Sequence, residues 1–419
     1  MPPSHDPQHN KKLAKIVNDP VHGFIEIPRG LILNLIDTPV FQRLRRIKQL
    51  GQSSLVYPGA VHTRFNHALG AMHLMRQALD VLRRKKVEIS KREYKAALIA
   101  ILMHDVGHGP FSHALEHVII PGLHHENMSL ALMRSLDRQF KGKLGMAIDI
   151  FTGDYERRFL HQLVSGQLDM DRMDYLIRDS FFTGVAEGVV GIDRIIKILN
   201  VYGDQLVCED KGIYSLEKFV LARRLMYWQV YLHKTAVAGE HMLINVLRRV
   251  RELVEGGEAV YLPENLGFFF RNQISPDQLE EEEVLKRYIR LDDNDVEFAI
   301  KQWQLAQDPV LSDLSQALLG RRLLKIRLQG AAFEPALVAE TRERYAQKKG
   351  MSFEDAGYYV FSGQVKNQAY TENSKEPILV WFKDGQLRDL SEATDMQNIH
   401  ALASPVVKHY FCAPTEVME

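Results

Sequence analysis

Three histidines and an aspartate occur within thirteen positions of the chain, directly behind an unbroken apolar run. The stretch ILMHDVGHGPFSH occupies residues 101–113, and the run AALIAILM occupies residues 96–103. Burying an ionised carboxylate without a partner is prohibitively costly, so Asp105 must be paired, hydrogen-bonded or bound to a metal ion. For His104 and Asp105 taken alone, the ordinary alternative is a satisfied core histidine beside a loop-capping aspartate.

A second segment, TRFNHALGAMHLMRQALDVL, carries a histidine on an otherwise apolar helical face. Residues 67, 71, 74, 78 and 81 are His, Ala, Leu, Ala and Val, and this spacing places them on one side of a helix. His67 is therefore predicted to point inward. His73 shares its face with polar residues, and we predict that it lies at the surface.

A third segment, SGQLDMDRMDYLIRD, adds another inward carboxylate. Asp174 is expected to form an i,i+4 ion pair with Arg178, whereas Asp171 has no such local partner. Two inward histidines and two inward carboxylates from three helices predict a ligand set for one divalent cation: His67, His104, Asp105 and Asp171.

The residue types in this set limit the metal and its chemistry. Imidazole and carboxylate ligands without thiolate suit manganese, iron, nickel, zinc or magnesium rather than a structural zinc site. Such a set leaves coordination positions open, at which a water can be acidified and a phosphoryl oxygen polarised.

The helix that must carry His104 has a recognisable beginning. Ser90 and Glu93 form an S-x-x-E capping box just before the apolar run. Because that run is apolar on every side, it predicts a fully buried helix. The residue before a proline avoids the α region, so Gly109-Pro110 is predicted to end the helix.

Composition excludes several classes of protein. The chain has 419 residues, of which 46% are hydrophobic and 25% charged, and its formal net charge is zero. These values exclude a disordered or fibrous chain, and the neutral balance makes nucleic acid an unfavoured main partner. Cys208 and Cys412 lack a metal-binding spacing, and the longest apolar run is too short to span a bilayer. We therefore expect a cytoplasmic protein without a membrane partner.

Periodicity divides the chain into three parts. Residues 1–14 form a polar N-terminal arm, and helical periodicity dominates from residue 15 to about residue 255. Residues 256–419 mix loops and short helices with strand patterns in YYVFSGQV, PILVWFKDGQLRDL and VVKHYFC. We predict a mainly α protein with a helical core over residues 15–255 and a smaller C-terminal α+β region over residues 256–419. No phosphate-binding GxxxxGK[ST] loop is present, so side chains must hold any nucleotide.

The ordered motifs resemble those of a known family. The order His67, His104-Asp105, Asp171 resembles the H…HD…D signature of the HD-domain metal-dependent phosphohydrolases. The likeness to the deoxynucleoside triphosphate triphosphohydrolase branch extends over NDPVHGFIEI, DTPVFQRLRRIKQLG, YPGAVHTRFNHALG, MHDVGHGPFSH, HHEN, DMDRMDYLIRD and YLHK. It covers residues 15 to about 240 and implies an HD-domain helical core.

This resemblance implies roles for individual residues. The four candidate ligands match the family's metal ligands. His108, His113 and His125 match the histidines around the reacting phosphate, and Glu126 follows as a candidate orienting carboxylate. Cleavage at the α-phosphorus expels a deoxynucleoside 5′-oxygen, a poor leaving group that benefits from a general acid. His113 is the predicted acid, because the pKa of histidine lies near working pH.

The resemblance also implies the substrate contacts. The negative charge of a triphosphate must be balanced by guanidinium and ammonium groups. The matching cations are Arg64, Arg172, Arg223 and Lys234. Surface ion pairs are the ordinary alternative for all four. The positions matching sugar and base contacts are Gln49, Leu50, Tyr175, Asp179 and Tyr231. An apolar or aromatic wall at the 2′ carbon would disfavour a ribose hydroxyl.

A further set matches an activating nucleotide site that lies between subunits in the vertebrate branch. Its positions here are Lys15, Ile16, Asp37, Gln42 and Arg45. The partners implied are a dNTP substrate, GTP or a dNTP as activator, and copies of the chain in a dimer or tetramer. A structural alternative stays open, in which Asp37 is the N-cap of a helix over DTPVFQRLRRIKQL and Arg45 forms a surface pair.

Three functions are compatible with these observations. The leading one is metal-dependent hydrolysis of dNTPs to deoxynucleoside and inorganic triphosphate. The alternatives are hydrolysis of nucleoside monophosphates or other phosphoesters by an HD phosphohydrolase, and non-catalytic nucleotide sensing. The complete ligand set and the three phosphate histidines favour an enzyme. A zincin protease is excluded, because its motif needs a glutamate base and a helix that continues past it.

Overall fold

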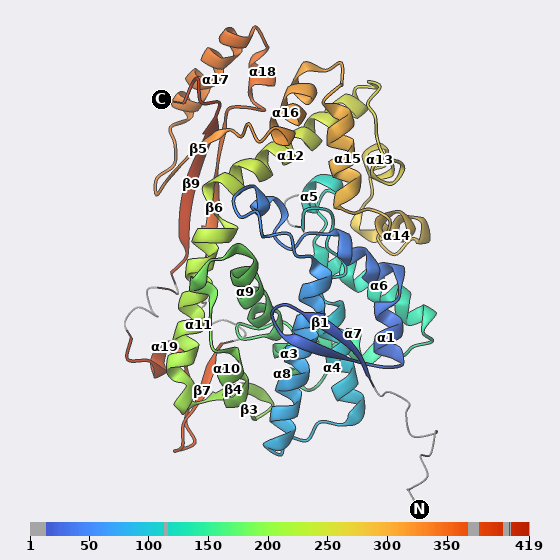
Figure 1. Ribbon diagram of the computed structural model, residues 1–419, viewed down its shortest axis with the longest axis vertical. Coiled ribbons are helices and arrows are strands. Elements are labelled where there is room, and N and C mark those ends of the chain that lie inside the picture. The colour runs from blue at the N-terminus through green and yellow to red at the C-terminus, as the bar shows by residue number, and fades with distance from the viewer. Residues whose placement is uncertain (1–13, 113–115, 368–376, 397–401, 403, 419) are drawn as a thin grey trace, which may run out of the picture.

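Over the residues that the structure describes, the fold is a helical body with three small β-sheets, which confirms the prediction of a mainly α protein with a smaller α+β part. The computed structural model describes residues 14–112, 116–367, 377–396, 402 and 404–418. The predicted arm over residues 1–14 lies outside this range except for Ala14. Figure 1 shows the early helices in the lower part of the view, a second group of helices at the upper end, and α12 running between them.

Helices of different lengths make up most of the chain as far as residue 255. They are α1 (Leu31–Ile36), α2 (Pro39–Gln42), α3 (Arg64–Arg84), α4 (Lys91–Met103), α5 (Glu116–Ile119), α6 (His125–Gln139), α7 (Gly145–Thr152), α8 (Arg158–Gln162), α9 (Met170–Thr183), α10 (Ile192–Ile198), α11 (Ile213–Met226) and α12 (Lys234–Glu255). Helix α3 packs against both α4 and α9. These three helices therefore bring the three predicted ligand segments together.

The later helices form the upper group in Figure 1. They are α13 (Glu264–Arg271), α14 (Glu282–Tyr288), α15 (Asp293–Trp303), α16 (Pro309–Leu319), α17 (Pro335–Lys349) and α18 (Phe353–Ala356), and α19 (Leu390–Ala393) follows lower down. Helix α16 packs on α12. One continuous apolar core joins the two groups.

The strands form three sheets, and part of this arrangement was not predicted. The strands are β1 (Ala14–Asp19), β2 (Gly23–Pro28), β3 (Leu199–Tyr202), β4 (Gln205–Glu209), β5 (Lys325–Gln329), β6 (Phe361–Asn367), β7 (Leu379–Trp381), β8 (Leu387–Asp389) and β9 (Val406–Ala413). The three C-terminal strand patterns are confirmed as β6, β7–β8 and β9. The sheets have the orders β1-β2, β3-β4-β7-β8 and β5-β9-β6. Strand β7 pairs in parallel with β4, with Val380 opposite Cys208, so a late segment completes a sheet begun before residue 255.

The β1–β2 hairpin and the β3–β4 pair lie in the region where helical periodicity dominates, and neither was predicted. Both pairs are short and antiparallel, with Asp19 opposite Gly23 in the first and Tyr202 opposite Gln205 in the second. Four to six residues give too few alternations to stand out from the surrounding helical pattern.

Helix α4 begins as predicted and ends earlier than predicted. The capping box is present, because Ser90 N donates to Glu93 Oε2 at 2.7 Å and Glu93 N donates to Ser90 Oγ at 3.1 Å. The helix ends at Met103, so the predicted end at Gly109-Pro110 is wrong. Ser129 on α6 explains the difference, because its hydroxyl donates to His104 O at 2.7 Å and accepts from Gly107 N at 2.9 Å. Tertiary partners thus take the backbone groups that would have continued the helix.

Gly107 allows α6 to approach this turn. A Cβ atom at Gly107 would lie 2.2 Å from the carbonyl oxygen of His125 and 2.2 Å from the amide nitrogen of Ser129. Both are backbone atoms that cannot move aside. The turn that carries His104, Asp105 and His108 is therefore locked against the first turn of α6.

Arg43 holds the same turn from the other side. The side chain is 0% exposed and donates to three carbonyls, those of Leu291 at 2.9 Å, Val106 at 2.9 Å and His108. Burial lowers the pKa of Arg43. One guanidinium therefore ties the ligand-bearing turn to the start of α15, and the sequence analysis missed this residue.

The segment DTPVFQRLRRIKQL is not a single helix capped by Asp37, so that structural alternative is wrong. Thr38 is the N-cap of α2, and its Oγ1 accepts from Phe41 N at 3.4 Å. The chain then tightens into a 3₁₀ turn over Arg43–Arg46. Arg45 is exposed, donates to Gln42 Oε1 at 2.8 Å, and its guanidinium lies 3.6 Å from the centre of the Phe65 ring. Its partners are therefore an amide and an aromatic ring.

None of the helices in the described part of the chain combines the length and the apolar character that crossing a bilayer requires.

We predict that Arg43→Met destabilises the fold through the three buried carbonyls that lose their donor. Each buried acceptor left unsatisfied costs on the order of 1–3 kcal/mol, so unfolding free energy should fall by about 3 kcal/mol or more in urea titrations. Arg45→Met is the matched control, because Arg45 sits two positions along on the exposed side, and its loss should stay within about 1 kcal/mol. Equal losses for both variants would contradict the assigned role of Arg43.

Candidate active site

The four predicted ligands come together at the junction of α3, α9 and the turn after α4. His67 Nε2 lies 3.0 Å from Asp171 Oδ1 and 3.6 Å from Asp105 Oδ2. His104 Nε2 lies 3.3 Å from Asp105 Oδ1 and 3.5 Å from Asp171 Oδ1. Donor atoms of two imidazoles and two carboxylates thus surround one small volume.

Both imidazoles are oriented by their other nitrogen. His67 Nδ1 donates to Asp174 Oδ2 at 2.8 Å, and His104 Nδ1 donates to the carbonyl of Ile101 at 2.6 Å. Among the described residues, no group meets either Nε2 at hydrogen-bonding geometry, although both atoms are buried. Metal-binding histidines show this arrangement, in which the outer N–H is bound by a carboxylate or carbonyl and the inner nitrogen keeps its lone pair for the cation. The residues present therefore fit a divalent metal ion.

The electrostatics of the cluster agree with a cation site. Burial acts to lower the pKa of His67, but the carboxylates of Asp171 and Asp174 outweigh it and raise the pKa to about 10. Burial acts to raise the pKa of Asp171, but the two imidazoles outweigh it and hold the pKa well below its usual range. The site thus favours the protonated form of the His67 imidazole. A divalent cation would compete with this proton for the same nitrogen.

A second group lies against the first. Asp105, His108 and His125 place donor atoms within 4.8 Å of one another, and the two imidazole rings stack with centroids 3.8 Å apart. Arg64 donates to Asp105 Oδ2 at 2.5 Å and to Ser112 Oγ at 2.8 Å. Burial and then the Arg64 guanidinium lower the pKa of His108 well below its ordinary value. His108 therefore faces the site as a neutral imidazole.

The predicted general acid, His113, lies outside the described residues. The residues just before it are held under backbone strain, because Phe111 and Ser112 have φ angles of +54° and +55°. Asp293 accepts from Phe111 N at 2.8 Å and from Lys48 N at 2.9 Å, and this bridge sustains the conformation.

A cavity of about 490 Å³ opens from the two groups. Proteins commonly bind small molecules in pockets of roughly 300–1,000 Å³. Besides Asp105, Asp171, His108, His125 and Glu126, the predicted substrate residues Gln49, Leu50, Arg64, Arg172, Tyr175, Asp179 and Tyr231 line it. Seven of the nine predicted substrate residues therefore share one cavity with Asp105 and Asp171, two of the four predicted ligands.

Two arginines lie close together at the cavity. Arg172 on α9 donates to the carbonyl of Gly166 at 2.7 Å. Arg223 on α11 is buried, and within the described part of the chain its Nε and Nη1 have no hydrogen-bond partner. Burial and then the neighbouring Arg172 lower the pKa of Arg223. A buried guanidinium with unused donors beside a second one is a site for an anion.

Asp179, which also lines the cavity, is held on both of its oxygens. His62 Nε2 donates to Oδ1 at 2.7 Å, and Tyr231 Oη donates to Oδ2 at 2.7 Å. Tyr231 belongs to a π-helical turn over Tyr227–Tyr231, a rare geometry that is frequent at functional sites. Tyr227 joins Tyr175 and Tyr231 in the lining, so this wall is largely aromatic.

The remaining predicted residues lie elsewhere. Lys234 is exposed in the first turn of α12 and is not part of the cavity lining as the described residues define it. Lys15 and Ile16 are exposed on β1, and Asp37 and Arg45 are exposed around α2. Gln42 is half-buried and donates to the carbonyl of Ile36 at 2.8 Å. Four of these five side chains are therefore exposed, and the fifth is engaged locally.

Sequence reasoning missed four residues of the site. Asp174 was predicted only as the partner of Arg178, and that ion pair is present at 2.8 Å, but Asp174 also orients His67. Asp169 caps α9 by accepting from Arg172 N at 2.7 Å, and burial raises its pKa to about 6. The remaining two are His62 and Glu240. Asp171 and Asp174 stand at i,i+3, a spacing that could have indicated that both face His67.

His73, predicted at the surface, is half-buried and lies beside His22 with ring centroids 5.3 Å apart. It takes no part in the cluster.

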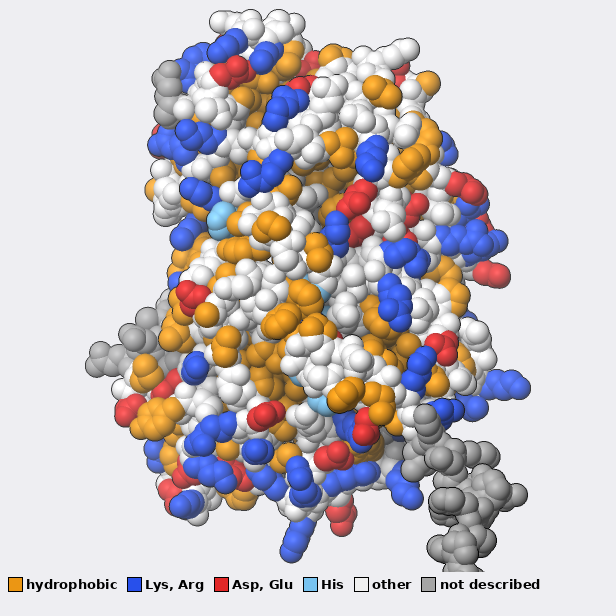
Figure 2. Space-filling model, in the orientation of Figure 1, with side chains coloured by type: hydrophobic (Ala, Val, Ile, Leu, Met, Phe, Trp, Pro, Cys, Tyr) orange, Lys and Arg blue, Asp and Glu red, His pale blue; other side chains and the backbone are white. Residues whose placement is uncertain are grey.

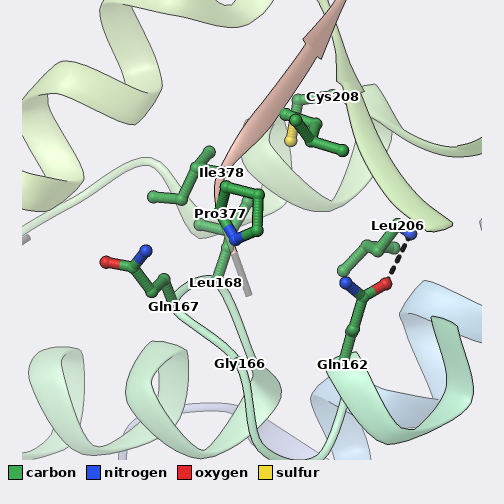
Figure 3. A pocket seen from close by; sticks show the side chains of 9 residues that line it. Gln162, Gly166, Gln167, Leu168, Leu206, Cys208, Pro377 and Ile378 are labelled. Carbon is green, nitrogen blue, oxygen red and sulfur yellow. Dashed lines mark hydrogen bonds between the residues drawn. The ribbon is translucent and has the colours of Figure 1, made fainter. Parts of the chain in front are cut away.

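A smaller cavity lies between the 166–168 loop and strands β4 and β7 (Figure 3). Gln162 Oε1 accepts from Leu206 N at 2.7 Å beside it, and Cys208 and Ile378 give it an apolar wall. Its volume of about 20 Å³ holds roughly one water molecule, so it excludes a nucleotide.

The surface offers no competing basic tract on the face shown in Figure 2. Lys and Arg side chains are interspersed with Asp and Glu there. This mixture agrees with the zero formal charge of the sequence.

Comparisons with known proteins agree with this geometry. A family model described as an HD associated region matches residues 190–260. In solved structures, the chain is similar to a phosphohydrolase from Bacteroides thetaiotaomicron, with 47% identity, a TM-score of 0.91, and coverage of 96% of this chain and 99% of that one. It is also similar to the uncharacterized protein YwfO of Bacillus subtilis, with 32% identity over 91% of this chain and 88% of the relative.

Relatives with a named activity match over a shorter span. The deoxynucleoside triphosphate triphosphohydrolase SAMHD1 of Homo sapiens is 31% identical over 58% of this chain and 45% of its own length. The SAMHD1 homolog of Dictyostelium discoideum is 34% identical over 59% of this chain and 51% of its own length. The chain thus spans about half the length of these relatives.

The matching signature, the clustered imidazoles and carboxylates, and the relatives that cover nearly the whole chain lead to one conclusion. The chain belongs to the HD-domain phosphohydrolases, in the branch that contains the deoxynucleoside triphosphate triphosphohydrolases.

Proposed function

We propose that this phosphohydrolase cleaves deoxynucleoside triphosphates into deoxynucleoside and inorganic triphosphate. One observation carries the proposal: the cavity beside the four-ligand cluster is lined by guanidiniums and by the doubly held Asp179 among aromatic rings. A polyanion requires cationic groups, whereas a sugar hydroxyl requires a hydrogen-bond acceptor. The lining of the cavity includes both kinds of group together with the proposed ligands Asp105 and Asp171.

The proposed ligands are His67, His104, Asp105 and Asp171. The metal ion would supply Lewis acidity toward a phosphate oxygen and toward water. Manganese, iron, nickel, zinc and magnesium all accept this donor set.

The chain's own residues would bind and orient the triphosphate. Arg64 reaches the site through Asp105, and neutral His108, stacked on His125, can donate a hydrogen bond to phosphate without adding charge. Arg172 and the unpaired donors of Arg223 would hold the outer phosphates. In the reaction, one water oxygen bonds to the α-phosphorus, the bond to the 5′-oxygen breaks, and that oxygen gains a proton. His113 is the proposed donor of that proton on the resemblance alone.

The sugar would meet Asp179 and Tyr175. Both oxygens of Asp179 already accept one hydrogen bond, which fixes the carboxylate while leaving lone pairs for a 3′-hydroxyl. The Tyr175 hydroxyl is buried, and no described residue hydrogen-bonds it. An aromatic wall of this kind leaves little room for a 2′-hydroxyl, so we infer a preference for deoxyribose.

The activating site over Lys15, Ile16, Asp37, Gln42 and Arg45, the oligomer that it requires, and the cytoplasmic location stay predictions. The exposure of four of these five residues is compatible with a contact between copies of the chain.

A panel of nucleotides tests the proposed activity. Purified protein with Mn²⁺ is expected to release deoxynucleoside and intact triphosphate from dNTPs, with rNTPs poorer substrates, as followed by chromatography of both products. Adding GTP or a second dNTP tests activation in the same assay. Release of orthophosphate from monophosphates alone would support the phosphoesterase instead, and nucleotide binding without turnover would support a sensor.

The ligand assignment predicts a loss of metal without a loss of fold. Asp171→Asn and His104→Ala should each lose most of the bound metal, measured by elemental analysis, and lower turnover on the order of 10²-fold or more. Their circular dichroism spectra should stay helical. Asp193→Asn, which changes an exposed aspartate in the first turn of α10, is the control and should keep metal and activity. Full metal content and parental turnover in either ligand variant would refute the assignment.

The raised pKa of Glu240 predicts that substrate binding depends on pH. Glu240 lines the cavity, and burial raises its pKa to about 7, so the carboxyl is neutral below that pH and ionised above it. If only the neutral form admits the polyanion, KM should rise roughly fivefold between about pH 7 and about pH 8. Glu240→Gln cannot ionise and should flatten this rise. An unchanged KM profile in the variant would remove Glu240 from substrate binding.

A further inference from the structure

We propose that Asp19 and His22, in the turn of the β1–β2 hairpin, are positioning residues of the metal centre that act through Asp174 on His67. The inference rests on the proposed metal site and extends it to a segment more than 40 residues before the first ligand in the chain. Figure 1 shows the hairpin crossing the front of the helical body near α3.

Asp174 is the point at which the hairpin and the ligand meet. Its Oδ2 accepts from His67 Nδ1 at 2.8 Å and from Arg178 Nε at 2.8 Å. Its Oδ1 accepts from His22 Nε2 at 2.6 Å and from Arg178 Nη2 at 3.0 Å. A carboxylate has about four lone-pair positions, so the side chain is saturated and held in one orientation. His22 therefore supplies one of the four hydrogen bonds that fix the carboxylate behind His67.

Asp19 places His22. Its Oδ1 accepts from the amide nitrogens of Val21 and His22, each at 3.0 Å, which closes the turn of the hairpin. Its two oxygens also bind Arg178, at 2.8 Å and 3.3 Å. Asp19 thus anchors the turn to the same guanidinium that grips Asp174.

The network is dry and closely packed. The side chains of Asp174, Arg178 and His67 are all 0% exposed, and the side chain of His22 is 7% exposed. A Cβ atom at Gly70 would lie 1.9 Å from Asp174 Oδ1 and 2.3 Å from Arg178 Nη2, so α3 leaves only the room of a glycine here. Water cannot readily replace a missing partner in such a space, and a buried hydrogen bond to a charge cannot be lost without moving the carboxylate.

The hairpin depends on these polar contacts for its own position. A two-stranded sheet is at best marginally stable alone, and apolar burial comes from Ile25 and Ile27 on β2. On β1, Lys15 and Ile16 face solvent, and Asp19 ties the end of the strand to Arg178 on α9. A displacement of the hairpin would withdraw His22 from Asp174 and release one restraint on His67. The orientation of a metal ligand is therefore coupled to the position of the N-terminal hairpin.

The test measures metal binding rather than turnover. His22→Ala should weaken Mn²⁺ binding by roughly 10–100-fold, the usual effect of removing a group that orients a ligand. Titration followed by electron paramagnetic resonance gives the Kd, and the visible absorption of the Co²⁺-loaded protein reports ligand geometry. His22→Gln can still donate to Asp174 and should restore much of the affinity. His73→Gln is the matched control, because His73 is half-buried beside His22 and does not hydrogen-bond Asp174.

A second variant guards against a general loss of structure. Asp19→Asn keeps the side-chain shape and weakens the grip on Arg178, and it should also raise the Kd for Mn²⁺ and shift the Co²⁺ spectrum while circular dichroism stays parental. If the unaltered protein binds Mn²⁺ and both His22→Ala and Asp19→Asn keep its Kd and spectrum, the positioning role is refuted. If the unaltered protein itself binds no Mn²⁺, or Asp171→Asn binds it equally well, the proposed metal site has failed first.

Discussion

Neutralising buried carboxylates is the constraint on which the rest of this structure depends. Asp19, Asp105, Asp171 and Asp174 all lie within one network of contacts around His67, and the guanidiniums bound to them belong to Arg64 and Arg178. Four negative charges and two positive ones leave an excess of two negative charges when the imidazoles are neutral. A desolvated excess of this size is very costly, and it can be removed by protonating the imidazoles or by binding one divalent cation. The raised pKa of His67 is the first of these solutions, and it shows how strongly the site attracts positive charge.

The backbone around the site follows from the same constraint. The turn after α4 presents His104, Asp105 and His108 to the same site, whereas a continuing helix would turn Asp105 roughly 100° around its axis from His104. The turn is stable because its carbonyls and amides have side-chain partners, chiefly Arg43 and Ser129. Glycines at positions 70 and 107 then let α9 and α6 approach until side chains and backbone meet without intervening water. Charge neutralisation, hydrogen bonding of the backbone and close packing are thus achieved at the same place in the fold.

The parts that sequence could predict are those in which local pattern and tertiary role agree. His67 was predictable because it interrupts an apolar stripe on a long helix, and the start of α4 was predictable because its capping box uses neighbouring residues. The end of α4 was mispredicted because Ser129 and Arg43, distant in the chain, compete for its last backbone groups. Asp174 illustrates the same limit. Its pair with Arg178 is local and was predicted, whereas its bonds to His67 and His22 span 107 and 152 residues and leave no mark in the periodicity.

The contrast between the two arginine pairs links this charge arrangement to function. Arg64 and Arg178 donate hydrogen bonds to carboxylates of the protein, so they balance negative charge that the chain itself has buried. Arg223 is as deeply placed, but its Nε and Nη1 find no acceptor among the described residues, and Arg172 beside it adds a like charge. The unused donors of Arg223 are unfavourable unless an acceptor binds them, because a buried cation loses hydration and is repelled by Arg172, which itself is paired with Asp169 at 3.3 Å. The protein therefore has an excess of negative charge at the proposed metal site, and among the described residues it leaves buried donors of Arg223 without an acceptor beside the cavity-lining Arg172. In the proposed function, the metal ion would satisfy the first and the triphosphate the second.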